Sequence, residues 1–475
     1  MKDGTTKLKR ILLLTIITLL IGSGLPAISH AQEKSEFIRV GLNFTSAATK
    51  EVGISASEGL AVWDFKSDET FLMLTGVKQV TLVGEAGELF VKGDTNEQIT
   101  VDMEGRTIPV AGLLSKGYAL VSSDYMDYLN AEVKTFDSVI RFNNKAYRGG
   151  MSFMVNANDT IQVINKLSID EYTYGVINGE MNCSNPLEAL KAQAVVARSY
   201  AITNMGRHEF SGYDLCDSTH CQVYKGYEDE HPQTNQAVND TKNLGIFHEN
   251  LPVAPYYFKN SGGHTQNVED VWNGKLGYLR GVLDPYSPSY KWETTFTFSE
   301  LESKLKMAGY NVGAVKSVAI IEKNSAGAVS SIEFKGSSGT TVLFKEKIRT
   351  VLGPTALKST LFNMDSGTQS SVSEMFLMGN KASDIAGQKI HILNGAGKTV
   401  ELNILNSYIT DQKALAQLFG YKAGEPAVTG DSVTFRGSGY GHGVGMPQDS
   451  AIAMAKAGFD FKEILNYYYK DIEIY

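Results

Sequence analysis

The stretch of chain that follows Asn185 constrains the fold more than any other, because it predicts a long helix rich in alanine. Asn185 is a favourable N-cap, Pro186 suits the first helical position, and Glu188 follows the cap by three residues. Apolar side chains then recur at steps of three and four residues, at Leu187, Leu190, Ala194, Ala197 and Ala201. We therefore expect an amphipathic helix whose small side chains let a neighbouring element pack closely against it.

Short β-like runs lie before this helix and after it, with turn residues between them. Runs at 38–42, 80–83 and 89–91 predict a β-rich N-terminal domain over residues 37–140. Strands, helices and glycine-rich loops alternate over residues 146–475, which predicts a second, loop-rich domain with a small β-containing insertion at 361–430. The expected fold class is therefore α+β, with a mixed, loop-rich domain after the β-rich one.

The first 31 residues predict an export signal. Four basic residues lie within the first ten, and residues 11–21 are apolar apart from two threonines. That run is shorter than the roughly 20 residues that a membrane-spanning helix needs. Ser29 and Ala31 are small residues at the two positions that a signal peptidase reads. An uncleaved membrane anchor is the alternative, and in either case we expect an exported protein that is secreted, associated with the cell wall or membrane-anchored.

The charge balance is acidic. Of the 44 basic and 52 acidic residues, four and one lie within residues 1–31, so the remaining chain carries 40 and 51 and a net charge of −11. This balance argues against a nucleic-acid partner, because nucleic-acid binding rewards a basic surface. An uncharged glycan is compatible with it.

Glu180 is the first candidate for chemistry, because it lies between a strand-like run and the predicted helix. A carboxyl group there can point into a groove, and apolar neighbours such as Met181 can raise its pKa. A raised pKa suits a general acid. A structural or surface glutamate is the alternative, since the residue type alone does not prove a role.

A second candidate is a cluster of zinc-ligand residue types within fourteen positions, made up of His208, Cys216, His220 and Cys221. Zinc takes four such ligands in tetrahedral sites, and a closed site of four protein ligands is structural. Asp214 and Asp217 are candidates for outer partners of these ligands. The alternatives are a Cys216–Cys221 disulfide, free thiols, and histidines unrelated to metal.

Two further loops are candidates for ligand contact. Five glycines fall within residues 437–445 around His442, and glycine lets a backbone approach a ligand closely. Tyr440 adds a face on which a sugar can stack, whereas no Lys-Ser/Thr follows to make a phosphate loop. A structural turn with His442 satisfied in the core is the alternative. The polar loop at 260–265, which contains Ser261, predicts a ligand contact or a plain turn.

These segments together resemble the stage II sporulation protein D and amidase-enhancer family. The matching segments are residues 171–200, 216–224, 256–265 and 437–469, in the order in which the family has them. The strings EALKAQAVVARSY and GHGVGM are specific enough to make chance a poor explanation. Residues 361–430 do not align with the family.

The resemblance implies a lytic transglycosylase that cleaves peptidoglycan glycan strands. In the family, the Glu of the matching Gly-Glu-Met segment is the catalytic acid, which is Glu180 here. The acid protonates the oxygen between N-acetylmuramic acid and N-acetylglucosamine, and the carboxylate then takes a proton from the muramic C6 hydroxyl. That hydroxyl attacks C1, so the product carries a 1,6-anhydro end and no water is consumed.

The resemblance also implies further site residues. Substrate contacts are implied at Lys191, Arg198, Ser261, Tyr440, His442 and Gln448, with a role in fixing Glu180 as the alternative for Lys191 and Arg198. Some relatives carry zinc at a Cys/His cluster, which implies a structural zinc ion at His208, Cys216, His220 and Cys221. The sequence departs from the family at Pro447, where relatives have serine between the same Met and Gln.

The implied partners are peptidoglycan glycan strands and a cell-wall amidase or other septal wall hydrolase. The biological setting is sporulation or vegetative wall turnover. A non-catalytic glycan-binding module that recruits or stimulates such an amidase is the alternative function.

Overall fold

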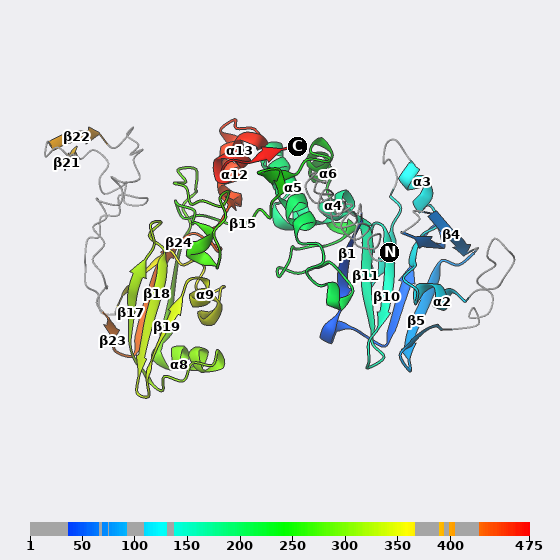
Figure 1. Ribbon diagram of the computed structural model, residues 1–475, viewed down its shortest axis with the longest axis horizontal. Coiled ribbons are helices and arrows are strands. Elements are labelled where there is room, and N and C mark those ends of the chain that lie inside the picture. The colour runs from blue at the N-terminus through cyan, green and yellow to red at the C-terminus, as the bar shows by residue number, and fades with distance from the viewer. Residues whose placement is uncertain are drawn as a thin grey trace, which may run out of the picture. The chain divides into compact units, whose positions relative to one another are not determined.

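The computed structural model describes residues 37–65, 69–74, 76–92, 109–130, 137–365, 389–393, 399–403 and 427–475. The predicted export signal and most of the predicted insertion lie outside these residues. Within the described ranges, no helix is both long enough and apolar enough to cross a membrane. Helices and several separate sheets confirm the expected α+β fold class (Figure 1).

The first half of the chain is built on two sheets. In spatial order, the larger sheet consists of β12 (Leu215–Cys216), β1 (Phe37–Asn43), β11 (Ile161–Ser168), β10 (Gly150–Val155), β7 (Ala119–Ser122), β3 (Leu60–Asp64) and β4 (Glu69–Leu74). The second sheet consists of β6 (Glu88–Val91), β5 (Gln79–Glu85), β2 (Glu51–Ser55), β8 (Ile140–Phe142) and β9 (Lys145–Tyr147). Three short helices accompany them, η1 (Thr45–Ala47), α2 (Val110–Leu114) and α3 (Tyr125–Asn130).

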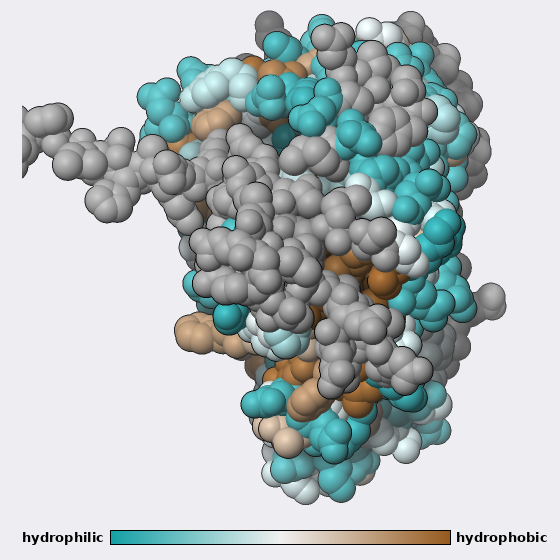
Figure 2. Space-filling model, turned by 90° about the vertical axis from the view of Figure 1, so that its right-hand side faces the viewer, coloured by the Kyte–Doolittle hydropathy of each residue, from teal (hydrophilic) through white to brown (hydrophobic). Residues whose placement is uncertain are grey.

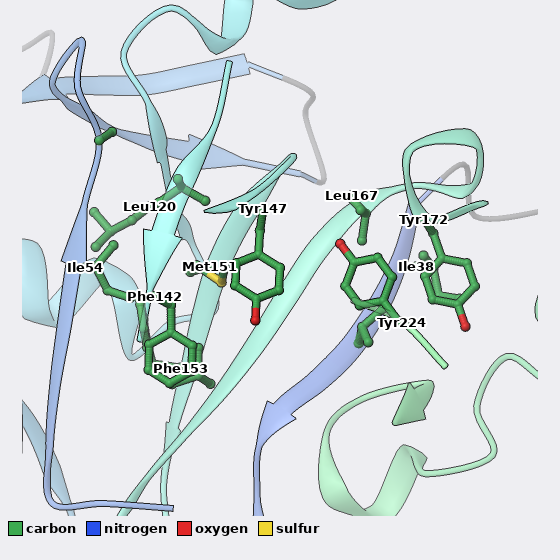
Figure 3. Packing of buried hydrophobic residues seen from close by; sticks show 14 of the residues in the cluster. Ile38, Ile54, Leu120, Phe142, Tyr147, Met151, Phe153, Leu167, Tyr172 and Tyr224 are labelled. Carbon is green, nitrogen blue, oxygen red and sulfur yellow. The ribbon is translucent and has the colours of Figure 1, made fainter. Parts of the chain in front are cut away.

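A large hydrophobic core joins these two sheets to the helices that follow. Alternate residues of β5 are buried, so one face of that strand meets the core, as a period of two requires. Figure 3 shows core side chains from β1, β7, β10 and β11 together with Tyr172 and Tyr224. Strand β1 pairs with β11 in antiparallel register, so the boundary predicted between 140 and 146 falls within a shared sheet and core. Outside, hydrophilic residues cover much of the described surface in Figure 2.

Two consecutive helices lead to and from Glu180, α4 (Ile169–Glu180) and α5 (Leu187–Thr203). The strand-like run expected before Glu180 is wrong, because this segment is helical and begins with a capping box. The Ser168 hydroxyl accepts a hydrogen bond from the Glu171 amide, and the Glu171 carboxylate accepts one from the Ser168 amide. Gly175 lets α4 approach Tyr224, since a Cβ there would lie 2.5 Å from that ring.

Helix α5 confirms the predicted alanine-rich helix, and its alanines are buried. Its predicted cap is wrong, because the N-cap is Pro186 and makes no side-chain hydrogen bond. The Asn185 side-chain amide instead donates to the carbonyl oxygen of Asn182 at 2.8 Å. Helix α6 (Pro232–Asp240) packs against both α4 and α5.

The second half contains a separate hydrophobic core. One sheet there is formed by β19 (Thr340–Phe344), β18 (Val329–Gly336), β17 (Val315–Lys323) and β23 (Val428–Thr429), and another by β16 (Lys291–Thr297), β24 (Ser432–Ser438) and β20 (Phe362–Asp365). Helices α8 (Phe298–Met307) and α9 (Glu346–Leu352) pack beside them (Figure 1). The two ends of the predicted insertion, β20 and β23, belong to these sheets. Between them the structure describes an antiparallel pair, β21 (Lys389–Leu393) and β22 (Thr399–Asn403).

The C-terminal elements return to helix α5. Helices α12 (Gln448–Lys456) and α13 (Phe461–Tyr468) both contact it, and β25 (Met446–Pro447) pairs in parallel with β15 (Tyr257–Phe258). The remaining short elements are η2 (Glu209–Ser211), η3 (Tyr227–Asp229), β13 (Ile246–His248), β14 (Leu251–Pro252), α7 (Val268–Val271) and β26 (Glu473–Ile474). This return brings the glycine-rich loop beside the segment that contains β15.

The side chain of Asn165 hydrogen-bonds to three residues around the first core, and we predict that removing it strongly lowers the stability of the fold. This fully buried amide donates to the carbonyl oxygens of Arg148 and Gly150, and its oxygen accepts from the Tyr224 hydroxyl. Asn165→Ala should lower the free energy of unfolding by about 3 kcal/mol, because it leaves buried polar groups without partners. Tyr224→Phe removes one of the three bonds and should cost about 1 kcal/mol. Denaturant titration of both variants measures this, and equal stability of Asn165→Ala and the parent would contradict it.

Candidate functional site

Glu180 is the last residue of α4, and its half-buried carboxyl group meets donors from separate segments. The Val223 amide donates to Glu180 Oε1 at 3.1 Å. The Gln448 amide, from the start of α12, donates to the main-chain oxygen of Glu180 at 3.1 Å and interacts with its carboxyl group as well. The Tyr257 hydroxyl is a third hydrogen-bond partner of the carboxyl group.

The environment of Glu180 acts on its protonation in two opposite ways. Burial raises the pKa of the carboxyl group above its ordinary value, since burial penalises the charged form. The hydrogen bonds from Val223, Tyr257 and Gln448, and the positive charge of Lys225, oppose that rise because they stabilise the carboxylate. The net pKa is raised. This carboxyl group can therefore hold a proton and also exist as a stabilised anion, which a general acid and base requires.

The direction of the Tyr257 hydrogen bond follows from its neighbours. The Tyr172 hydroxyl donates to Gln222 Oε1 at 3.2 Å, so the amide orientation of Gln222 is set. Gln222 Nε2 then donates to the Tyr257 oxygen at 3.3 Å, which leaves the Tyr257 proton for Glu180. Burial raises the pKa of Tyr257 well above its ordinary value, so this hydroxyl stays protonated. Sequence reasoning missed Gln222, Val223 and Tyr257 as site residues, although all three lie within the segments that resemble the family.

The four predicted metal ligands converge. One ligand atom from each of His208, Cys216, His220 and Cys221 lies within 4.8 Å of the others. His208 Nε2 is 3.3 Å from the Cys221 sulfur, and His220 Nδ1 is 3.6 Å from each sulfur. Tetrahedral zinc with bonds of about 2.0–2.3 Å separates its ligands by about 3.3–3.8 Å, so these three distances match those expected around zinc. Both cysteines are free thiols, so the structure does not contain the alternative disulfide.

The chain around this cluster connects it to Glu180. Cys221 and Val223 are two residues apart, so the loop that carries the ligands also presents the amide that binds Glu180. Asp214 does not serve the cluster as expected. Its carboxylate instead forms an ion pair with Arg39 at 2.8 Å and accepts from the Gly206 amide.

Arg198 and Lys191 are engaged by protein groups. Arg198 is 3% exposed, pairs with Asp170 at 3.1 Å, and donates to the carbonyl oxygens of Val238, Thr241 and Leu244. Burial lowers its pKa from the ordinary arginine value. Contrary to expectation, Arg198 therefore has no surface from which to contact a glycan. Lys191 bridges Glu188 at 3.0 Å and Asp240 at 3.1 Å.

The Ser261 hydroxyl is also hydrogen-bonded to another protein group. Its buried hydroxyl donates to Asp284 Oδ2 at 2.5 Å. The same buried carboxylate accepts from the Ser450 hydroxyl at 2.6 Å and from the Tyr468 hydroxyl at 3.0 Å. Ser261 thus ties the 260–265 loop to helices α12 and α13, and its hydroxyl is not presented to a ligand.

His442 contacts the site through Tyr257. His442 Nδ1 accepts from the Val444 amide at 3.1 Å, so Nε2 carries the proton and donates to the Tyr257 carbonyl oxygen at 3.1 Å. Burial lowers the pKa of His442 to about 3, and the ring packs against Trp272 with a centroid separation of 4.8 Å. A neutral imidazole with both nitrogens engaged is a positioning group, which matches the structural alternative for this loop.

The predicted residues therefore differ in their relation to Glu180. Gln448 touches Glu180 directly, and His442 holds the backbone of Tyr257. Tyr440 pairs with Asn260 through both main-chain hydrogen bonds, and its ring is half-buried. Arg198 and Ser261 are enclosed elsewhere in the fold.

The chain is similar in sequence to several known proteins. A family model described as Stage II sporulation protein matches residues 157–248, and one described as Domain of unknown function (DUF8618) matches residues 261–380. An uncharacterized protein of Brachyspira hyodysenteriae is 29% identical over 337 residues, which cover 70% of this chain and 73% of that protein.

Two Bacillus subtilis proteins are also similar. The amidase enhancer is 29% identical over 316 residues, covering 62% of this chain but 39% of its own length. Stage II sporulation protein D is 25% identical over 331 residues, covering 66% of this chain and 76% of its own. Residues 157–248 therefore carry a domain of the Stage II sporulation protein family, and the chain is similar to both the amidase enhancer and stage II sporulation protein D.

Proposed function

We propose that this protein is an exported peptidoglycan lytic transglycosylase, in which Glu180 is the general acid and base. The observation that carries the proposal is the Glu180 carboxyl group, whose pKa is raised by burial while three donors can stabilise its anion. Glycosidases usually need a pair of carboxyl groups, whereas an intramolecular attack needs one.

In the proposed reaction, this one carboxyl group carries out both proton transfers. Protonated Glu180 donates its proton to the oxygen that links the muramic C1 to the next sugar, and the C1–O bond breaks. The resulting carboxylate is stabilised by the Val223 amide and the Tyr257 hydroxyl. It then accepts the proton of the muramic C6 hydroxyl as that oxygen bonds to C1. The product is a 1,6-anhydro end, and Glu180 is again protonated.

A second candidate function is a glycan-binding module that recruits or stimulates a cell-wall amidase. The observation in its favour is the similarity to the amidase enhancer of Bacillus subtilis. In this case peptidoglycan and an amidase are both partners, and the Glu180 site binds a strand without cleaving it. The two functions differ in whether a chemical product depends on Glu180.

We further propose that His208, Cys216, His220 and Cys221 hold a structural zinc ion. Four protein ligands complete a tetrahedral shell and leave no position for a reacting group. A bound ion would fix the loop that leads from Cys221 to Val223, and through it the amide that faces Glu180.

We predict that Glu180→Gln abolishes cleavage. Glutamine keeps the shape of the side chain but cannot transfer the proton, so anhydro-ended fragments should fall by about 10³-fold. Purified protein would be incubated with glycan strands, with and without stem peptides, and the products analysed by mass spectrometry. Glu228→Gln, which changes an exposed carboxylate paired with Arg141, is the matched control and should cleave normally. Fragments at parental levels from the Glu180→Gln protein would rule out Glu180, and binding without cleavage by the parent would favour the second function.

Tyr257→Phe should move the pH profile. The Tyr257 hydroxyl donates to the Glu180 carboxylate and so lowers its pKa, and its loss should raise that pKa further. Because the first step needs protonated Glu180, kcat/KM should persist to higher pH, so the alkaline limb shifts upward. Steady-state rates across a pH series measure this shift. An alkaline limb that moves to lower pH would contradict the assigned direction of the hydrogen bond.

Zinc content tests the metal proposal. We expect about one zinc ion per chain by elemental analysis, and a lower Tm after chelation. Cys221→Ser should lose the ion, whereas Cys183→Ser should retain it, because Cys183 lies outside the cluster. Parental zinc content in the Cys221→Ser protein would refute the site.

A further inference from the structure

A second group of side chains lies close to Asn260 and consists of Tyr290, Lys358 and Tyr440. The Lys358 ammonium lies against two half-buried tyrosine rings, 5.2 Å from the ring centroid of Tyr290 and 5.8 Å from that of Tyr440. The rings are 5.8 Å apart and inclined by 39°. Lys358 also donates to the Tyr290 hydroxyl at 3.3 Å. Two aromatic faces and one positive charge therefore meet at one place.

The backbone holds all three residues in place. The Gly439 amide donates to the Tyr290 carbonyl oxygen and the Gly441 amide to that of Lys358, both at 2.9 Å. Between those glycines, Tyr440 exchanges two main-chain hydrogen bonds with Asn260, at 2.8 and 3.0 Å. The side chains therefore start from fixed positions, which lowers the entropic cost of ordering them around a ligand.

Lys358 has no carboxylate partner among the described residues, whereas the nearby Lys259 pairs with Asp449 at 2.8 Å. The polar contact of its ammonium is the neutral Tyr290 hydroxyl. A half-buried ammonium gains most from an anion, because part of its hydration is already lost. The flanking rings offer flat apolar faces to the C–H groups of a sugar.

The group lies close to a residue that contacts Glu180. Tyr257, which contacts Glu180, and Asn260, which pairs with Tyr440, are three residues apart, so their Cα atoms are separated by at most about 11 Å. Asn260 also donates to Asp449, the neighbour of Gln448. A glycan of a few sugar units can span such a distance.

We propose that Tyr290, Lys358 and Tyr440 form a subsite for a sugar that bears a carboxylate, in which the rings stack on the pyranose and the ammonium pairs with the anion. The inference rests on the proposed glycan substrate but not on its cleavage. In peptidoglycan the carboxylate has two sources, the lactyl group of muramic acid in strands without peptides and the stem peptides in strands that retain them.

Binding measurements on the Glu180→Gln protein test the subsite without turnover. Three ligands would be titrated by calorimetry, namely glycan strands without stem peptides, strands with them, and an uncharged N-acetylglucosamine oligomer. Adding Lys358→Met should weaken binding of a carboxylate-bearing strand by about tenfold and leave the uncharged oligomer unaffected. Lys347→Met is the matched control, since it removes the same charge from an exposed position on α9. Tyr290→Leu should weaken all three ligands, because stacking does not depend on charge.

The outcomes are separable. A loss confined to peptide-free strands identifies the lactyl carboxylate, and a loss confined to peptide-bearing strands identifies the stem peptide, and both support the subsite. An equal effect of Lys358→Met and Lys347→Met, or an equal effect on charged and uncharged ligands, overturns it. Failure of the parental protein to form anhydro ends would refute the proposed reaction while this binding pattern stands.

Discussion

The partly buried carboxyl group of Glu180 is the constraint around which the fold is arranged, because such a group is tolerated only where donors meet it. Its donors come from the 222–225 segment, from strand β15 and from the start of helix α12, which are far apart in the sequence. Helix α5 packs against α4, which carries Glu180, and both C-terminal helices pack on α5. The alanine-rich face of α5 permits that close packing, so the strongest sequence pattern in the chain supports the site without contributing a reacting group.

The glycine-rich loop at 437–445 also supports the site, because it packs closely against the segment that contains β15. A Cβ on Gly445 would lie 2.0 Å from the Tyr256 carbonyl oxygen, and the residue has a φ of 80° that favours glycine. The approach lets β25 pair with β15 and brings His442 to the Tyr257 carbonyl oxygen. The sequence alone favours a ligand contact and a structural turn equally for this loop. In the structure most of it positions β15, while the ring of Tyr440 is half-buried.

Sequence patterns predict the features that depend on local spacing or on a resemblance, and they miss those that depend on contacts between distant segments. The helix after Pro186, the α+β class and the convergence of the four metal-ligand residues follow from the spacing of apolar residues or of ligand types. Helix α4 resembles a strand-like run because its apolar residues are few and mixed with glycine, although Ser168 and Glu171 carry a capping-box signal. Helical spacing puts Arg198 on the same side as Lys191, seven residues earlier. Its guanidinium is nevertheless buried, and it donates to a carbonyl oxygen of α6 and to two more in the segment that follows α6. The hydrogen bonds from Tyr172 through Gln222 to Tyr257 join residues 35 or more positions apart, and no local pattern encodes them.

The 222–225 segment shows how the N-terminal region contributes to the site. At one end it continues from Cys221, one of the four proposed zinc ligands. Beyond its other end, Glu230 makes a bidentate pair with Arg148, at 2.7 and 2.9 Å, and both side chains are buried. Arg148 precedes β10 and also lies over the rings of Tyr128 and Tyr227. Losing one partner of such a buried pair costs about 3–5 kcal/mol, so this end of the segment is firmly held. The Val223 amide therefore lies between Cys221 and this ion pair, whose Arg148 precedes strand β10. The β-rich N-terminal region is thus part of the support for Glu180.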